Sequence, residues 1–247
     1  MVSVCKSILI FFLLCNVSTA YADSVLMAFS HNIPPYIFEK KDKGIEIDII
    51  AAALAYKGHS LKPRYFPLSR IPLAFKGKWV DAAMGDMGVD LIPHGGFYAN
   101  PTIIYENVFI TLKNQNIVIG KPEDLDSLTI VSFQGAEKRY KSWLEKANNE
   151  KRFYGTSNQY SQVKLLYFKR YDVVLSDRYI FKYFLKQLQL TDDAFKLSVD
   201  EHKFITANPL DYRPIFRDKK VRDDFNEGLQ AIKKSGEFKK IYDKYMN

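Results

Sequence analysis

Three aspartates stand where a carboxylate could bind an ammonium group. Asp86 follows the apolar run 80–84, Asp90 lies in the loop after it, and Asp177 follows the apolar run 173–175. A side chain just beyond a buried strand is well placed to reach a ligand, and an ionised carboxylate offers about four lone-pair sites. Asp177 could equally be a helix N-cap, and Asp86 and Asp90 could be solvated loop residues. All three are candidate ligand-binding residues.

Arg70 is the candidate for binding an acid group. In the stretch FPLSRIPLAF, Ser69 is suited to an N-cap and Pro72 is allowed in a first helical turn. A cation in that turn opposes the helix dipole by about 0.3–1 kcal/mol, so an anion should compensate it. The anion is either a surface carboxylate or the acid group of a ligand, which a guanidinium fork suits well.

Gln134 and Gly135 lie between an expected strand at 128–133 and an expected helix at 136–147. The backbone N–H groups of such a turn could hold an anionic group of a ligand. The alternative is that Gly135 only permits a tight turn.

Tyr36 lies in a stiff loop between an expected strand at 25–29 and a helix at 47–54. Pro34 and Pro35 precede it, and because proline fixes φ, the loop is extended and preset. Such a loop could display the ring to a ligand. The alternative is that Tyr36 fills the edge of a core.

The sequence contains none of the common catalytic or metal-binding motifs. The four histidines are scattered, and no nucleophile elbow, P-loop or dinucleotide-binding glycine pattern occurs. We therefore expect no catalytic residue, no metal and no cofactor. The net charge of +8 is spread along the chain without basic blocks interleaved with aromatic residues, which argues against nucleic acid as a partner.

Strand and helix patterns alternate along the chain, which predicts an α/β fold. Further helices are expected at 69–76, 163–168, 180–188, 221–232 and 238–245, and a further strand at 61–66. Residues 102–112 and 117–119 are expected to form two strands around a polar turn. The stretches KWVDAAMGD (78–86) and KRYDVVLSD (169–177) share one pattern, which indicates two lobes built alike.

Residues 1–22 have the pattern of a secretory signal peptide. Lys6 precedes the apolar run ILIFFLLC, and Ala20-Tyr21-Ala22 is a cleavage pattern. Its removal would leave 225 residues with a charge of +7 and no cysteine, because Cys5 and Cys15 lie within it. No second apolar stretch approaches the roughly 20 residues that span a membrane. We expect a soluble, monomeric protein in the periplasm.

The order and spacing of four segments resemble the periplasmic solute-binding proteins of family 3, the polar amino acid type that feeds ABC transporters. The segments are HNIPPYIFEKKDKGIEIDII (31–50), GKWVDAAMG (77–85), DLDSLTIVSFQG (124–135) and the closing stretch 202–246. The resemblance covers nearly all of residues 23–247. It implies a two-lobed, periplasmic-binding-protein-like fold of type II, in which two α/β lobes joined by two hinge strands enclose a ligand cleft.

The resemblance also implies domain boundaries and roles. Lobe 1 comprises 23–110 and 201–247, lobe 2 comprises 111–200, and the hinges lie near 108–114 and 197–204. Tyr36 matches an aromatic residue that packs on the ligand, and Asp177 matches an aspartate that binds its ammonium group. One departure is clear. The arginine that clamps the carboxylate of amino acids is absent from GVDLIPH (88–94), so Arg70 is the candidate replacement.

We therefore expect a non-enzymatic protein that captures a small polar solute, an amino acid or a related amine-bearing zwitterion, for an ABC permease in the inner membrane. Two alternatives stay open. One is an enzyme of the cyclohexadienyl dehydratase type on the same fold, for which Glu46 and His94 are the available general acid or base. The other is a free-standing sensory protein that passes its signal to a membrane receptor.

Overall fold

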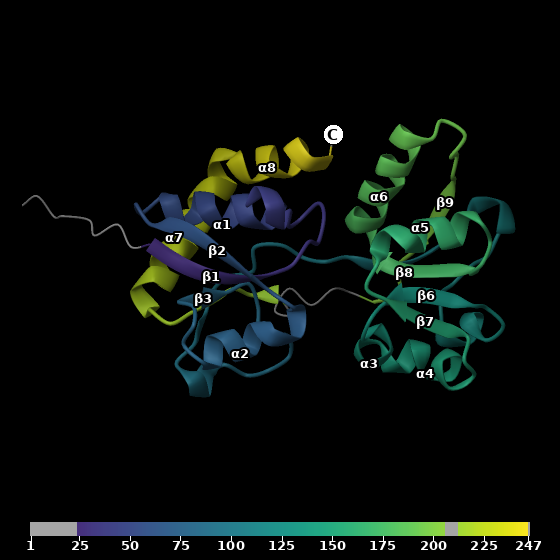
Figure 1. Ribbon diagram of the computed structural model, residues 1–247, viewed down its shortest axis with the longest axis horizontal. Helices are drawn as coiled ribbons and strands as arrows, with labels where there is room; N and C mark the ends of the chain where they lie inside the picture. Colours follow the sequence, from purple (N-terminus) through teal and green to yellow (C-terminus); the bar gives the residue numbers. More distant parts are fainter. Residues whose placement is uncertain (1–23, 206–211, 247) are drawn as a thin grey trace, which may run out of the picture.

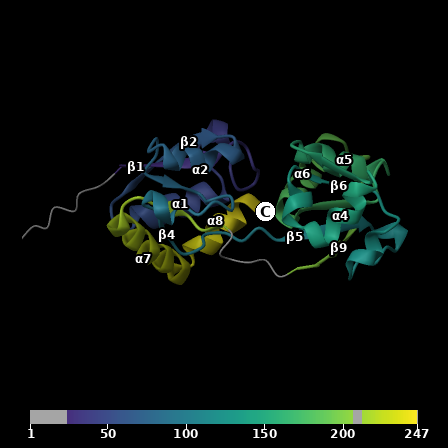
Figure 2. The same ribbon diagram turned by 90° about the horizontal axis from the view of Figure 1, so that it is seen from below.

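The computed structural model describes residues 24–205 and 212–246, which form two α/β lobes joined by two crossing segments (Figures 1 and 2). The expected fold class is confirmed. The predicted signal peptide lies outside the described residues. Within the described ranges, no helix has the length and apolar character needed to cross a bilayer.

The first lobe contains a five-stranded mixed sheet in the order β2-β1-β3-β10-β4. β1, β2 and β3 are parallel, whereas β10 is antiparallel to both of its neighbours. The strands are β1 (Ser24–Ser30), β2 (Ser60–Phe66), β3 (Ala82–Ala83), β4 (Phe97–Tyr98) and β10 (Ile215–Phe216). The α-helices are α1 (Ile45–Ala55), α2 (Ile71–Lys76), α7 (Lys219–Ser235) and α8 (Glu237–Met246), and short 3-10 helices occur at Glu39–Lys41, Leu68–Arg70 and Ile92–His94.

The second lobe repeats this plan with the strand order β7-β6-β8-β5-β9. β6, β7 and β8 are parallel, and β5 is antiparallel to β8 and β9. The strands are β5 (Asn107–Leu112), β6 (Ile130–Phe133), β7 (Phe153–Thr156), β8 (Val173–Asp177) and β9 (Val199–His202). The α-helices are α3 (Ala136–Arg139), α4 (Lys141–Asn149), α5 (Gln159–Tyr167) and α6 (Arg178–Thr191), with 3-10 helices at Lys113–Gln115 and Pro122–Leu125.

The pattern that residues 78–86 and 169–177 share has a structural reason. Lys78 and Lys169 each adopt a left-handed conformation, with φ of 58° and 52°, at the turn that leads from a helix to a strand. Asp81 then accepts a backbone N–H of β1 at 2.9 Å, and Asp172 accepts the N–H just before β6 at the same distance. Both aspartates thus tie the start of a strand to its neighbour, and the lobes are built alike.

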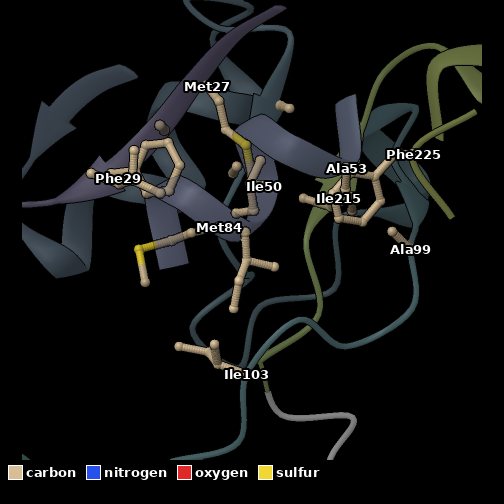
Figure 3. Packing of buried hydrophobic residues seen from close by; sticks show 14 of the residues in the cluster. Met27, Phe29, Ile50, Ala53, Met84, Ala99, Ile103, Ile215 and Phe225 are labelled. Carbon is tan, nitrogen blue, oxygen red and sulfur yellow. The ribbon is translucent and has the colours of Figure 1, made fainter. Parts of the chain in front are cut away.

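The core of the first lobe is centred on α1, which is apolar on nearly all sides. Met27 and Phe29 of β1 lie near Ile50 of α1, and Phe225 of α7 lies near Ala53 (Figure 3). A helix that is apolar all round must be covered all round. Here the sheet and α7 provide the cover.

Close packing of α7 on α1 depends on Gly228, because a Cβ there would overlap the carbonyl oxygen of Ala53. Gly228→Ala is therefore expected to destabilise the fold by about 1–3 kcal/mol through overpacking, although alanine in a helix interior is normally favoured over glycine by about 0.5–1 kcal/mol. Gly120→Ala is the control, since no atom lies closer than 3.9 Å to the added Cβ. Urea unfolding of both variants tests this, and a stabilised Gly228→Ala would contradict it.

The predicted pair of strands around the polar turn 113–116 was wrong. β5 begins only at Asn107, and both of its edges are occupied by β8 and β9. Residues 117–119 therefore have no free edge to pair with and form no strand. The expected helix at 136–147 is interrupted at Tyr140, where α3 ends and α4 begins.

The lobe boundaries follow from these pairings. The chain passes to the second lobe between β4 and β5, through residues 99–106, and returns between β9 and β10. The expected boundaries at 110/111 and 200/201 stay a prediction. β5 and β9 pair with one another in the second sheet, so these strands belong to the second lobe and the connecting segments lie outside them.

Candidate functional site

A cavity of about 1440 Å³ lies between the lobes. Its wall is formed by the β3–β4 loop and Tyr98 of the first lobe, by residues 133–143 of the second lobe, and by both crossing segments. This volume exceeds the roughly 300–1,000 Å³ that is usual for small-molecule sites. The carboxyl ends of β3 and β6 lead directly into this wall, which is where open α/β sheets bind ligands.

Tyr98 organises the wall of the first lobe. Its hydroxyl donates to Asp86 Oδ2 at 2.5 Å, and Asp86 Oδ1 accepts the backbone N–H of Gly88 at 2.9 Å. Burial and the hydrogen bond to Asp86 raise the pKa of Tyr98 to about 12, so the phenol stays protonated at neutral pH. Asp86 is thereby held as a hydrogen-bond acceptor beside the cavity.

Arg213 lies against the ring of Tyr98, with its guanidinium carbon 4.6 Å from the ring centroid. It lines the cavity, and no described residue forms a hydrogen bond or ion pair with it. Its Nε is buried and unpartnered. Leaving a buried donor unpaired costs about 1–3 kcal/mol, and an arginine fork suits the two oxygens of a carboxylate. Arg213 is therefore the best-placed group for an anionic part of a ligand.

The wall of the second lobe combines a glycine turn with cations and aromatic rings. Gly135 has a left-handed φ of 87° and precedes α3, whose residues Lys138 and Arg139 line the cavity. Arg139 donates to the hydroxyl of Tyr140 at 3.2 Å and lies 4.8 Å from the ring centroid of Tyr212. Trp143 completes this wall. The second lobe thus offers positive charge next to flat apolar surface.

Four of the seven predicted ligand-binding residues line the cavity: Asp86, Asp90, Gln134 and Gly135. The other three, Tyr36, Arg70 and Asp177, are not part of its wall. A contact between any of the seven and a ligand stays a prediction.

Asp177 is a buried helix cap and an interlobe contact. It is 2% exposed and accepts the N–H groups of Tyr179 and Ile180 at the start of α6, each at 3.0 Å. It also accepts the N–H of Glu106 at 2.7 Å and the hydroxyl of Tyr36 at 3.2 Å. Burial raises the pKa of Asp177 to about 6, although these hydrogen bonds lower it. The carboxylate of Asp177 is therefore enclosed and does not line the cavity.

Tyr36 is fully buried, which matches the alternative that it fills the edge of a core. Its ring centroid lies 4.6 Å from that of Tyr105, which lies 4.6 Å from that of Tyr212. This row of rings runs from the buried contact with Asp177 to the cavity, which Tyr105 and Tyr212 line. Tyr36 supports the cavity from behind.

Arg70 is exposed at the end of the 3-10 helix Leu68–Arg70, immediately before α2. Neither an ion pair nor a hydrogen bond connects its side chain to any described residue. The surface carboxylate that the sequence suggested is therefore not present in the described part of the chain. Its neighbour Leu68, not Arg70 itself, reaches the cavity.

The two candidates for acid–base chemistry lie away from the cavity. Glu46 is fully buried in α1, where its Oε2 accepts the hydroxyl of Tyr105 at 3.3 Å, and burial raises the pKa of Glu46 to about 8. His94 lines a separate, smaller hollow with Lys76, Lys78 and Arg217. Among residues 24–205 and 212–246, no group of three or more His, Cys, Asp or Glu side chains is arranged to hold a metal.

Two lobes of one plan, two crossing segments and a polar cavity between them define a class of two-lobed binding protein. The family model of bacterial extracellular solute-binding proteins, family 3, matches residues 25–247. The chain belongs to this family, as the sequence resemblance indicated. A comparison with curated proteins gives no match.

Solved structures of the same fold include binding, transport and sensor proteins. A histidine kinase sensor domain with similarity to periplasmic binding proteins is 19% identical, with coverage of 92% of this chain and 97% of that one and a TM-score of 0.67. An ancestral amino acid-binding protein, a precursor of cyclohexadienyl dehydratase, is 19% identical, with coverage of 91% and 95% and a TM-score of 0.67. The second substrate-binding domain of a putative amino acid ABC transporter from Streptococcus pneumoniae is 19% identical, with coverage of 91% and 100% and a TM-score of 0.63.

These likenesses show the fold.

Four residues of the cavity wall were not predicted from the sequence: Tyr98, Lys138, Arg139 and Arg213. Arg213 carries only a weak signal, in that it lies between an aromatic residue and Pro214 directly before an apolar pair, Ile215–Phe216. Nothing local in the sequence indicates that this arginine meets Tyr98.

Proposed function

We propose that this chain is a periplasmic solute-binding protein that captures a small polar solute bearing an acid group in the interlobe cavity. The observation that carries the proposal is Arg213, a cation in the cavity wall whose guanidinium forms neither a hydrogen bond nor an ion pair with any described residue. It takes the place of the family arginine that is absent from residues 88–94. Membership of an extracellular solute-binding family supports an exported protein.

An amino acid or a related zwitterion remains the proposed solute class. The hydroxyl of Tyr98 donates to Asp86, while Arg213 lies against the ring of the same residue. One tyrosine therefore contacts both the candidate for an acid group and the candidate for an ammonium group. An amino acid-binding neighbour and an amino acid transporter neighbour support this proposal, and delivery to an ABC permease follows from it.

We propose binding without catalysis. Glu46 is fully buried behind Tyr105, and His94 lies in another hollow, so neither is positioned to transfer a proton to a ligand in the cavity. The dehydratase-related neighbour makes a direct assay worthwhile. Purified protein is expected to leave prephenate and arogenate unchanged, and turnover of either would contradict this part of the proposal.

The sensor domain among the neighbours favours a second candidate, a protein that binds the same solute and signals through a membrane receptor. Both candidates use the same cavity. They differ in the partner. Transport requires that the purified protein restore solute uptake through a permease, and sensing requires a receptor that responds to the liganded form alone.

Substitution of Arg213 tests the site. Losing one partner of a desolvated charge pair costs roughly 2–5 kcal/mol, so Arg213→Ala is expected to weaken binding by about 30-fold or more. Arg213→Lys should recover only part of this loss, because an ammonium does not replace a planar fork. A thermal-shift screen of the common amino acids identifies a ligand, and calorimetry measures its affinity for each variant.

Arg70→Ala is the matched control, since it removes the same charge from the same lobe outside the cavity. It is expected to bind as tightly as the wild type. The reverse result, an intact Arg213→Ala and a defective Arg70→Ala, would contradict the role of Arg213 and favour the residue that the sequence indicated.

A further inference from the structure

We infer that the solute carries at least two acid groups, one bound by each lobe, so that the cavity selects a diacid over a solute with a single acid group. This inference deepens the proposed function and rests on it. It comes from the charges in the cavity wall and from which of them already have partners.

The described cavity wall is rich in basic side chains. Arg213 lines it from the first lobe, Lys138 and Arg139 line it from α3 of the second lobe, and Lys203 lies where the chain leaves β9. The acidic side chains in the same wall are Asp86, Asp90 and Glu106.

The three acids are already engaged by the protein. Glu106 accepts from Arg178 at 2.8 Å, and Asp90 accepts the N–H of Ile92 at 3.0 Å. Asp86 accepts from the Tyr98 hydroxyl and a backbone N–H. Of the three, only Glu106 forms an ion pair, and its cation is Arg178, which does not line the cavity. The acids therefore do not neutralise the cations of the wall.

Three of the cations have no such engagement. Within the described residues, Lys138, Lys203 and Arg213 form neither an ion pair nor a hydrogen bond. They stand on both sides of the cavity, with Arg213 near β10 and the two lysines at α3 and β9. Closing the lobes would bring these like charges together and remove water from them, which is costly unless each receives a counter-charge.

A diacid supplies a counter-charge on both sides. One acid group pairs with Arg213, the other pairs with the lysines of the second lobe, and the carbon chain between them packs on Phe133, Tyr140 and Trp143. A solute with a single acid group would neutralise the basic side chains of one lobe only, and those of the other lobe would lose water on closure without a counter-charge. The charge arrangement thus makes closure depend on the second acid group.

The experiment compares diacids with single-acid solutes on the wild type. The probes are the α,ω-dicarboxylates from succinate to suberate and L-glutamate, with L-glutamine and L-arginine as comparators. The series varies the separation between the two acid groups of the probe. At least one diacid is expected to bind about 100-fold more tightly than either comparator, since each tenfold corresponds to about 1.4 kcal/mol. Small-angle scattering should show a smaller radius of gyration with that diacid.

Two double variants separate local charge from overall charge. Lys138→Gln with Lys203→Gln should reduce the advantage of the diacid to less than about tenfold. Lys141→Gln with Lys164→Gln removes the same charge from exposed positions of the second lobe outside the cavity and should keep the advantage. Far-ultraviolet circular dichroism confirms that both are folded.

The outcomes distinguish the two proposals. If L-glutamine or L-arginine binds as tightly as every diacid, the inference is wrong and the proposed function stands. If no diacid binds, the inference is overturned whatever else binds. If, in addition, no amino acid in the screen binds, the proposed function falls as well. An equal loss in both double variants would show that overall charge, rather than the cavity wall, sets the preference.

Discussion

The Glu46→Gln variant is expected to be more stable than the wild type at pH 9 by about 5 kcal/mol and nearly equal to it at pH 4. Burial raises the pKa of Glu46 from 4.5 to about 8, and each pH unit of difference between the folded and unfolded states corresponds to about 1.4 kcal/mol. Between about pH 4.5 and pH 8, Glu46 keeps its proton in the folded protein and loses it in the unfolded chain. The contribution of Glu46 to the free energy of unfolding is therefore fully present below about pH 4.5 and is lost as the pH rises through about 8.

Glutamine keeps the shape of Glu46 and the hydrogen bond from Tyr105 without a titrating proton. Urea unfolding at a series of pH values measures the difference. Glu145→Gln is the control, because Glu145 is exposed on α4 and only forms a surface pair with Lys141. Because the pKa of Asp177 is also raised, its titration changes the free energy of unfolding below about pH 6, and it does so equally in every variant. Parallel stability curves for Glu46→Gln and the wild type would refute a buried proton on Glu46.

Asp177→Ala is expected to lower the free energy of unfolding by about 3–5 kcal/mol, because it leaves several buried donors without an acceptor at about 1–3 kcal/mol each. These donors are the Tyr36 hydroxyl and three backbone N–H groups. The alanine variant also lacks the desolvation cost of the carboxylate, which offsets part of the loss. Asp177→Asn should be intermediate, since the amide places an N–H₂ group against one of the donors that the carboxylate accepts.

The chain contains a matched control in Asp218, which caps α7 through the N–H groups of Lys220 and Val221 but is exposed. Asp218→Ala should cost about 1 kcal/mol, the usual effect of losing an N-cap. The amount by which the stability loss of Asp177→Ala exceeds that of Asp218→Ala reports the buried contacts with Tyr36 and Glu106. Equal losses for the two alanine variants, measured by urea unfolding at pH 7, would reduce Asp177 to an ordinary cap.

Most elements were predictable because their signals are local. The periodicity around Ile47–Leu54 and the apolar run 25–29 are sufficient for α1 and β1. The failed strand pair at 102–112 and 117–119 shows the limit. A polar turn between two apolar runs favours a hairpin, yet the edges of β5 are taken by β8 and β9, which come much later in the chain. The competition between distant partners is not visible in a local pattern.

The candidate site divides in the same way. Asp86, Asp90, Gln134 and Gly135 follow predicted strands, and all four line the cavity. Asp177 follows a strand too, but the approach of Tyr36 from the first lobe covers it. Arg213 lies in an irregular crossing segment. Its contact with Tyr98 exists only because β10 inserts between β3 and β4.

From the strand order of the two sheets we expect the second lobe to fold before the first. The second lobe, 107–202, is one uninterrupted stretch, and all its strand pairings join residues within that stretch. The first lobe lacks β10, which pairs Ile215 with Ala83, and lacks α7 against α1 until the last part of the chain is available. Pairings of large sequence separation form slowly, because loop closure must precede the contact. Once the second lobe has folded, the pairing of β5 with β9 holds residues 106 and 203 close together and shortens that loop closure. The second lobe would then act as a template on which the discontinuous first lobe assembles.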